Sequence, residues 1–260
     1  MPLLSTPVRP LGAPPRRIVS VVPSQTELLW ALGLEEEVVG ITKFCVRPVE
    51  WFRQKVRVGG TKTVHAERVH ALKPDLILAN REENVREQIE ELARHYPVWV
   101  SDVRHLADAL GMIEQVALLV GKQEAGQQLA RAIREHFEAH RPLPFWRPRR
   151  AAYFIWRKPW MVAGGDTFIH SMLLAAGFEN VFAHLQRYPQ VLLCELHTFS
   201  PEVILLSSEP YPFDERHIEE FQQACPQAQV MLVDGELFSW YGSRLLEAPR
   251  YFERLRAAIG

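Results

Sequence analysis

Large aromatic side chains and arginines come directly after predicted strands in both halves of the chain. Open α/β sheets bind ligands at the ends of their strands, so these residues are candidate ligand contacts. Flat rings with a few arginines suit a bulky, partly apolar ligand such as a macrocycle or a metal chelate, although each ring can instead be core packing. The candidates are Phe44, Asn80 and Arg81 in the first half, and Trp156, Trp160, Tyr188, Tyr211, Trp240, Tyr241 and Arg244 in the second.

The motifs that mark common enzyme sites are missing from the sequence. There is no Gly-x-Gly-x-x-Gly, no Walker loop, no Gly-x-Ser-x-Gly and no His-Glu-x-x-His. His136 and His140 stand four residues apart on a predicted helix and can share a metal, but no third ligand is near them in the sequence. Two such histidines are more often a solvated helix end that the helix dipole favours. We therefore predict no catalytic residues, no metal site and no catalytic cofactor.

Composition describes a globular chain without a bias towards charged partners. Lys plus Arg number 30 against 31 Asp plus Glu, and this balance gives no reason to expect nucleic acid. No apolar run approaches the roughly 20 residues of a membrane span. Residues 1–16 are rich in proline and arginine but have no apolar segment, which predicts a disordered arm and no signal peptide. The cysteines are too widely spaced for a disulfide framework and are predicted to be small buried residues: Cys45, Cys194 and Cys225.

One pattern occurs twice in the chain, as Leu72-Lys-Pro-Asp-Leu-Ile-Leu-Ala-Asn-Arg-Glu83 and as Phe199-Ser-Pro-Glu-Val-Ile-Leu-Leu-Ser-Ser-Glu-Pro210. In each copy a proline and a carboxylate end the preceding helix, four apolar residues predict a buried parallel strand, and a polar loop follows. The repeat indicates two matched halves. Their polar ends, Asn80–Arg81 and Ser208–Glu209, are expected to face one cleft.

The segments around these copies predict two lobes. Residues 17–101 alternate strands with helices, and residues 151–260 begin the same alternation again. Between them, residues 102–140 keep a helical apolar pattern, interrupted at Gly121, and a proline-stiffened basic connector completes the linking region 102–150. The predicted fold is α/β, with two lobes built on mainly parallel sheets, a long rigid backbone helix joining them, and a ligand cleft between them.

The loop after the first predicted strand admits two interpretations. Ser24 and Glu27 have the spacing of a capping box, so Ser24 can be a helix cap. Free amides at a helix start also suit polar ligand groups, so Ser24 can equally be a ligand contact. The two roles are compatible.

With these residues assembled, the chain resembles the helical-backbone metal receptors, which are substrate-binding proteins of ABC importers for cobalamin, haem and ferric siderophores. The resemblance covers about residue 17 to the C-terminus, and the cobalamin-binding members look most similar. It rests on the long helix and on these motifs: Val22-Pro-Ser-Gln-Thr-Glu27, Glu67-Arg-Val-His-Ala-Leu-Lys-Pro-Asp-Leu-Ile77, Gly164-Gly-Asp-Thr167 with Ala176-Gly177, and Tyr188-Pro-Gln-Val191 leading to Ser200-Pro-Glu-Val-Ile204.

The resemblance implies a ligand site and a docking surface. Members bind and hand over their ligand without chemistry, and their lobes move little because the helix is rigid. One exposed glutamate per lobe docks on the permease, and Glu67 matches the first. Cys194 stands at the second position with Glu195 one place later, so we expect that contact to be shifted or missing. By the same likeness the ligand-lining residues are Pro23, Ser24, Gln25, Phe44, Thr61, Asn80, Trp156, Trp160, Tyr188, Trp240 and Arg244.

Two classes of function follow from these observations. The first is a monomeric binding protein that carries a corrinoid to an ABC permease-ATPase complex, with a ferric siderophore or haem as the alternative ligand because Arg81, Arg187 and Arg244 suit an anionic chelate. The second is a cytoplasmic corrinoid-handling protein or enzyme on the same scaffold. The resemblance places the first in the periplasm or cell envelope, and the expected lack of a signal peptide favours the second.

Overall fold

A computed structural model describes residues 3–4 and 12–259, and these residues form two compact units. Unit one contains residues up to 103 together with 107–133 and 241–244. Unit two contains residues 104–106, 134–240 and the chain from 245 onwards. The chain therefore returns to unit one for the short segment 241–244. The predicted order, in which one lobe follows the other along the sequence, does not include this return.

Unit one is built on a sheet whose strand order is β1-β6-β5-β2-β3-β4, and every neighbouring pair in the described residues is parallel. β5, the strand of the first repeated stretch, is buried along its whole length, as its continuous apolar run predicts. The elements are β1 (Leu3–Leu4), β2 (Ile18–Ser20), α1 (Pro23–Ala31), β3 (Val38–Ile41), α2 (Val49–Gln54), β4 (Val56–Arg57), α3 (Ala66–Leu72), β5 (Leu76–Asn80), α4 (Arg86–Ala93), β6 (Val98–Ser101), α5 (Leu106–Leu119) and α6 (Gln123–Ala139).

Unit two has the strand order β11-β10-β7-β8, and β9 also pairs with β7. The pairs are parallel except β7 with β8, and the second repeated strand, β10, is again fully buried. The prediction of two α/β units with mainly parallel sheets is confirmed. The elements are β7 (Arg149–Trp156), β8 (Met161–Val162), α7 (Phe168–Ala175), β9 (Phe178–Asn180), the 3₁₀ helix η1 (Leu193–Phe199), β10 (Val203–Ser207), α8 (Glu215–Ala224), β11 (Gln229–Val233), α9 (Glu236–Ser239), the 3₁₀ helix η2 (Ser243–Leu246) and α10 (Ala248–Ile259).

The carboxylate that follows the proline in each repeated stretch has the same role in both units. Asp75 Oδ1 accepts from the backbone N–H of Arg17 at 2.8 Å, and Asp75 N donates to the Arg17 carbonyl at 2.9 Å. Glu202 Oε2 likewise accepts from Arg150 N at 3.0 Å, and Glu202 N donates to the Arg150 carbonyl at 2.8 Å. These bonds set the register between each repeated strand and its parallel neighbour, β2 or β7. The residue before each proline has a left-handed backbone that ends the preceding helix.

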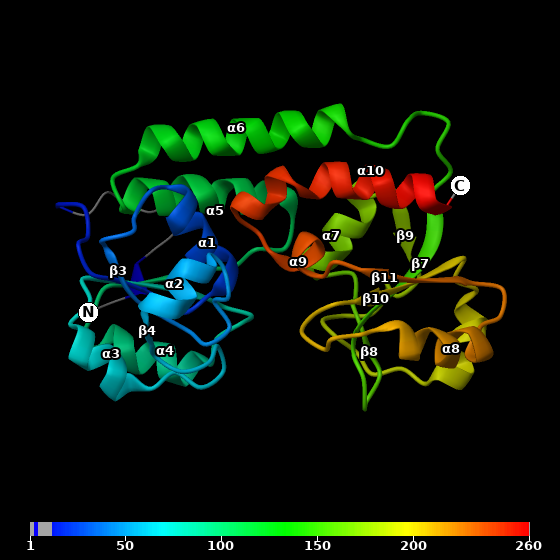
Figure 1. The fold of residues 1–260 in the computed structure, drawn as a ribbon, viewed down its shortest axis with the longest axis horizontal. Helices are drawn as coiled ribbons and strands as arrows, with labels where there is room; N and C mark the ends of the chain where they lie inside the picture. Colours follow the sequence, from blue (N-terminus) through cyan, green and yellow to red (C-terminus); the bar gives the residue numbers. More distant parts are fainter. Residues whose placement is uncertain (1–2, 5–11, 260) are drawn as a thin grey trace. The chain divides into compact units, whose positions relative to one another are not determined.

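The helical stretch 102–140 forms two helices, α5 and α6, which are separated where the sequence pattern is interrupted at Gly121. Gly121 has φ +70°, the left-handed conformation that ends α5 and lets the chain turn. α6 then runs back along α5 (Figure 1). The two helices touch at Gly126, where an added Cβ would lie 2.2 Å from the Cβ of Ala117. α6 supplies the backbone helix, since its residues up to Ile133 belong to unit one and the rest to unit two.

Two local predictions differ from the structure. α1 begins at Pro23 with Val22 as N-cap and no side-chain cap bond, so Ser24 lies inside the helix and the capping-box interpretation was wrong. The proline supplies the helical φ and takes the position where its missing N–H costs nothing. Within the expected disordered arm, Leu3–Leu4 pair with β6 as strand β1, while residues 1–2 and 5–11 lie outside the described residues. In the described part of the chain, no helix has the length and hydrophobicity that crossing a membrane requires.

Candidate ligand-binding site

The carboxyl end of β5 holds a buried polar network in unit one. Asn80 Nδ2 donates to Ser101 Oγ at 3.0 Å, and Gln25 Nε2 donates to the same hydroxyl at 2.6 Å. The side-chain oxygen of Asn80, Oδ1, accepts from the backbone N–H groups of Glu82 and Glu83 at 2.8 and 3.0 Å. Asn80 and Gln25, both predicted ligand contacts, thus share the Ser101 hydroxyl within unit one, and Asn80 also fixes the shape of the loop after β5.

Two further predicted contacts of unit one come from neighbouring loops. Asn84 Nδ2 donates to the Thr61 carbonyl at 3.0 Å, which ties the Thr61 loop to the segment after β5. Phe44 is 50% exposed, and its ring lies against Gly60, the residue before Thr61. The Lys43 ammonium lies 5.0 Å from the centre of that ring, a cation–π contact. Phe44 is therefore an exposed aromatic surface of the kind that a ligand can cover.

The returning segment 241–244 is attached to unit one by buried polar contacts. The Arg244 guanidinium forms an ion pair with the Glu27 carboxylate of α1, through Nη2 to Oε1 and through Nε to Oε2 at 3.2 Å. Tyr241 Oη donates to Glu83 Oε1 at 2.5 Å, and burial, followed by the Glu83 charge, raises the pKa of Tyr241 well above its ordinary value. The Ser24 hydroxyl is close enough to Tyr241 to lower this pKa, although it forms no hydrogen bond of normal geometry.

The arginines predicted for this edge already have carboxylate partners. Arg244 and Glu27 expose only 10% and 11% of their side chains, so their charges neutralise each other inside the unit. Arg81 Nη1 lies 2.8 Å from Asp102 Oδ2 in a pair that is largely exposed. The edge therefore has no surplus positive charge from these two residues.

In unit two, the two predicted tryptophans near the end of β7 differ in environment. Trp156 is 39% exposed, and its ring makes an edge contact with Tyr211 at 5.8 Å between centroids. Trp160 packs against the hydrophobic core, with its ring nearly parallel to that of Phe213 at 6.2 Å. Trp156 thus offers an exposed ring, whereas Trp160 stabilises the unit. Tyr188, in the loop before η1, is half-buried.

Trp240 is buried in unit two and bonds to the carboxylate of Glu209, in the polar loop after the second repeated strand. Its indole Nε1 donates to Glu209 Oε1 at 3.0 Å, and the hydroxyl of Ser239 donates to the same oxygen. Burial raises the pKa of Glu209. Glu27 and Glu83 were missed as site residues, whereas Glu209 was expected at the polar end of the second repeated strand but without a partner. The signal for Glu83 was its place in the polar loop after the first repeated strand.

The residues predicted for permease docking are all on the surface. Glu67 is exposed in the first turn of α3, and both Cys194 and Glu195 are exposed on η1. The prediction that the cysteines are buried holds for Cys45 and Cys225 but was wrong for Cys194. α3 and η1 are equivalent elements, because each directly precedes a repeated proline and strand. Among the described residues, no group of three or more His, Cys, Asp or Glu side chains is arranged to hold a metal ion.

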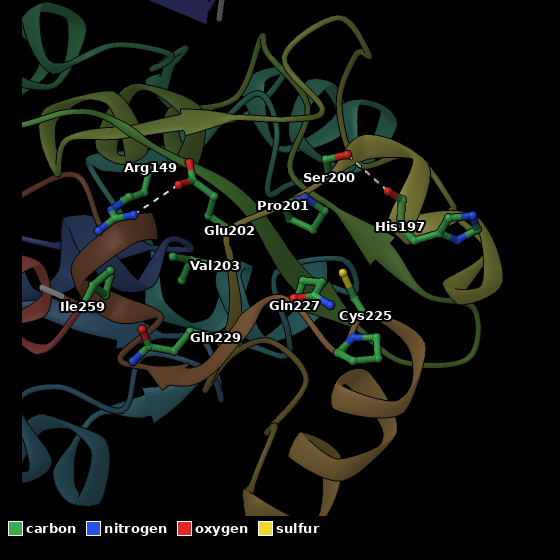
Figure 2. Close-up of a pocket in the computed structure, with 11 residues that line it drawn as sticks. Arg149, His197, Ser200, Pro201, Glu202, Val203, Cys225, Gln227, Gln229 and Ile259 are labelled. Carbon is green, nitrogen blue, oxygen red and sulfur yellow. Dashed lines mark hydrogen bonds and ion pairs between the residues drawn. The ribbon is translucent and has the colours of Figure 1, made fainter.

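A pocket in unit two lies at the opposite end of the sheet, where β7, β10 and β11 begin (Figure 2). Arg149 and Glu202 face each other there, with Nη1 and Oε1 3.2 Å apart. The backbone N–H of Arg150, together with the arginine side chains, lowers the pKa of Glu202. None of the ligand contacts predicted from the sequence lines this pocket, so it is separate from the candidate site.

Comparison with known proteins identifies the family of the chain. The sequence pattern of the periplasmic binding proteins matches residues 18–228. The chain belongs to the periplasmic binding protein family. A vitamin B12-binding protein of Yersinia pestis (strain Pestoides F) is 27% identical over 246 residues, which cover 94% of this chain and 87% of that protein.

Solved structures of periplasmic binding proteins share the fold. The periplasmic vitamin B12 binding protein BtuF of Vibrio cholerae has a TM-score of 0.81 at 22% identity, covering 95% of this chain and 98% of that chain. The periplasmic haem-binding protein RhuT from Roseiflexus sp. RS-1 also has a TM-score of 0.81 at 22% identity, covering 94% and 97%. The fold is therefore common to proteins with different ligands, and it does not choose between them.

Proposed function

We propose that this chain is the substrate-binding protein of an ABC-type importer, that it binds a corrinoid without changing it chemically, and that it delivers the ligand to a permease. The family match supports a substrate-binding role, and the relative at 27% identity over nearly the whole chain supports the ligand class. The family description supports a place in the periplasm or cell envelope. We propose that the chain acts as a monomer.

The observation that carries the choice of ligand is the pairing of two of the three arginines that would suit an anionic chelate, Arg81 and Arg244. Haem and many ferric siderophores are anionic, and an anionic ligand needs cations that are available to it. Arg244 is engaged by Glu27, and Arg81 by Asp102. A corrinoid has an amide-rich rim around a flat macrocycle, so it can be bound by aromatic rings and hydrogen-bonding groups.

We assign the ligand contacts according to exposure. Phe44, Trp156 and Tyr188 are exposed or half-buried and would lie against the macrocycle. The buried members of the predicted set would shape the site from beneath, and these are Pro23, Ser24, Gln25, Asn80, Trp240 and the side chain of Arg244. Arg81, Thr61, Trp160 and Tyr241 remain predicted contacts. Glu67 and Glu195 would dock on the permease, with Glu195 displaced by one residue from the position of Cys194.

Calorimetric titration of the purified chain tests the ligand class. We expect saturable one-to-one binding of cyanocobalamin, and weaker or no binding of haemin and of a ferric hydroxamate. Trp156→Ala should weaken cyanocobalamin binding about thirtyfold, because a buried aromatic anchor contributes about 2 kcal/mol. Trp30→Ala is the matched control, since Trp30 is 52% exposed and lies outside the predicted site.

Each outcome of this titration has a distinct meaning. Preferential binding of haemin would show that the ligand is haem and not a corrinoid. Binding of none of the three would refute the proposed function. Conversion of bound cyanocobalamin to another corrinoid, detected by chromatography, would show that the chain is an enzyme.

A further inference from the structure

Trp240 and Tyr241 are consecutive aromatic residues, and each bonds to a glutamate from the loop after a different repeated strand. Glu209 follows β10 and accepts from Trp240 Nε1 at 3.0 Å. Glu83 follows β5 and accepts from Tyr241 Oη at 2.5 Å. Trp240 belongs to unit two and Tyr241 to unit one, so the chain passes from one unit to the other between them. Each side of this passage is thus held within its own unit by a glutamate from an equivalent loop.

The carboxylate of Glu209 is largely buried, and two uncharged donors bond to it. Its Oε1 accepts from the hydroxyl of Ser239 and the indole of Trp240, both of which are uncharged. Burial disfavours its ionised form and raises its pKa, and the nearby carboxylates of Glu236 and Asp234 act in the same direction. The phenol of Tyr153 is also close enough to interact electrostatically with Glu209.

We infer that Glu209 is a positioning residue for ligand binding, because its carboxylate holds the Trp240 indole in the orientation that the ligand site requires. The inference rests on the proposed function, in which Trp240 shapes the site. Trp240 is only 6% exposed, and its Nε1 is its single polar atom, so an acceptor in a fixed place determines how the ring is oriented. A hydrogen bond to a charged acceptor is stronger than one to a neutral acceptor.

Protonation of Glu209 should loosen this arrangement. The pKa of the carboxyl is raised in the folded protein, so it takes up a proton at a higher pH than an ordinary glutamate as the pH falls. Uptake of the proton removes the charge from the acceptor of the Trp240 N–H. We therefore expect ligand affinity to fall as the pH is lowered.

The test compares cyanocobalamin affinity across pH 4.5–8 for the wild type, Glu209→Gln, Glu209→Ala and Glu236→Gln. Glu209→Ala should weaken binding about 10- to 100-fold at neutral pH, because a hydrogen bond to a charged group is lost. Glu209→Gln keeps an acceptor, so it should retain part of the affinity and lose the pH dependence. Glu236→Gln removes a neighbouring carboxylate that does not bond Trp240, so it should bind like the wild type at the upper end of the pH range. Its loss of affinity should occur at a lower pH, because the Glu236 charge helps to raise the pKa of Glu209. Equal affinities and equal pH profiles in all four proteins would overturn the inference.

A ligand-free measurement separates this inference from the proposed function. The emission of Trp240, obtained by subtracting the Trp240→Phe spectrum, should change with pH in the wild type and remain constant in Glu209→Gln. If this titration occurs but no chelate binds, the proposed function has failed while the hold of Glu209 on Trp240 stands. If the emission of Trp240 does not respond to pH or to Glu209→Gln, the hold itself is refuted.

Discussion

Replacing Arg244 with methionine should destabilise unit one strongly. The Arg244–Glu27 pair is bonded at two points, and both side chains are about nine-tenths buried. The substitution leaves the Glu27 carboxylate in the interior without its counter-charge. Breaking a buried pair in this way costs about 3–5 kcal/mol of unfolding free energy, whereas an exposed pair contributes about 0–1 kcal/mol. We expect a loss of about 3–5 kcal/mol for Arg244→Met.

Urea unfolding followed by circular dichroism measures this loss. Arg81→Met is the matched control, because Arg81 is paired with Asp102 at the surface and should change the unfolding free energy by less than about 1 kcal/mol. The double variant Glu27→Leu/Arg244→Met removes both charges and should recover most of the loss. A loss below about 1 kcal/mol in Arg244→Met would refute the reasoning, since the pair would then behave as a solvent-screened one.

Three further outcomes can be checked directly. Gly126→Ala should lower the unfolding free energy by about 1–3 kcal/mol, because the added Cβ would lie 2.2 Å from the Ala117 Cβ between α5 and α6. Calorimetry of the variant measures this loss, and an unchanged melting temperature would contradict the contact. Cys194 is exposed and should react with a thiol reagent in the native protein. Cys45 is buried, and burial raises its pKa to about 11, so it should react only after unfolding. Rapid reaction of Cys45 in the native protein would contradict its burial. Asp214, whose hydrogen bonds with the arginine two residues later lower its pKa from 3.8 to about 2, stabilises the fold above about pH 4, and this contribution is lost as the pH falls towards 2. Asp214→Asn should therefore flatten the dependence of the unfolding midpoint on pH in that range.

The aromatic residues at the strand ends show how far sequence patterns reach at the candidate site. The alternation of strands and helices correctly placed Trp156 at the end of β7 and Asn80 at the end of β5. It did not separate the exposed Trp156 from Trp160, which packs on Phe213 in the core. Position along a strand is local information, but burial depends on which helices later cover that strand. Exposure could therefore not be predicted residue by residue.

The sequence by itself determined the repeated proline, carboxylate and strand, because these features act on neighbouring residues through backbone conformation and apolar burial. It also determined the α/β class and the family. Only the tertiary structure decided which carboxylates partner the last loop. Arg244 meets Glu27 across 217 residues, and Tyr241 meets Glu83 across 158. Such pairs depend on the path that brings the segment 241–244 back to unit one, and no local spacing encodes that path.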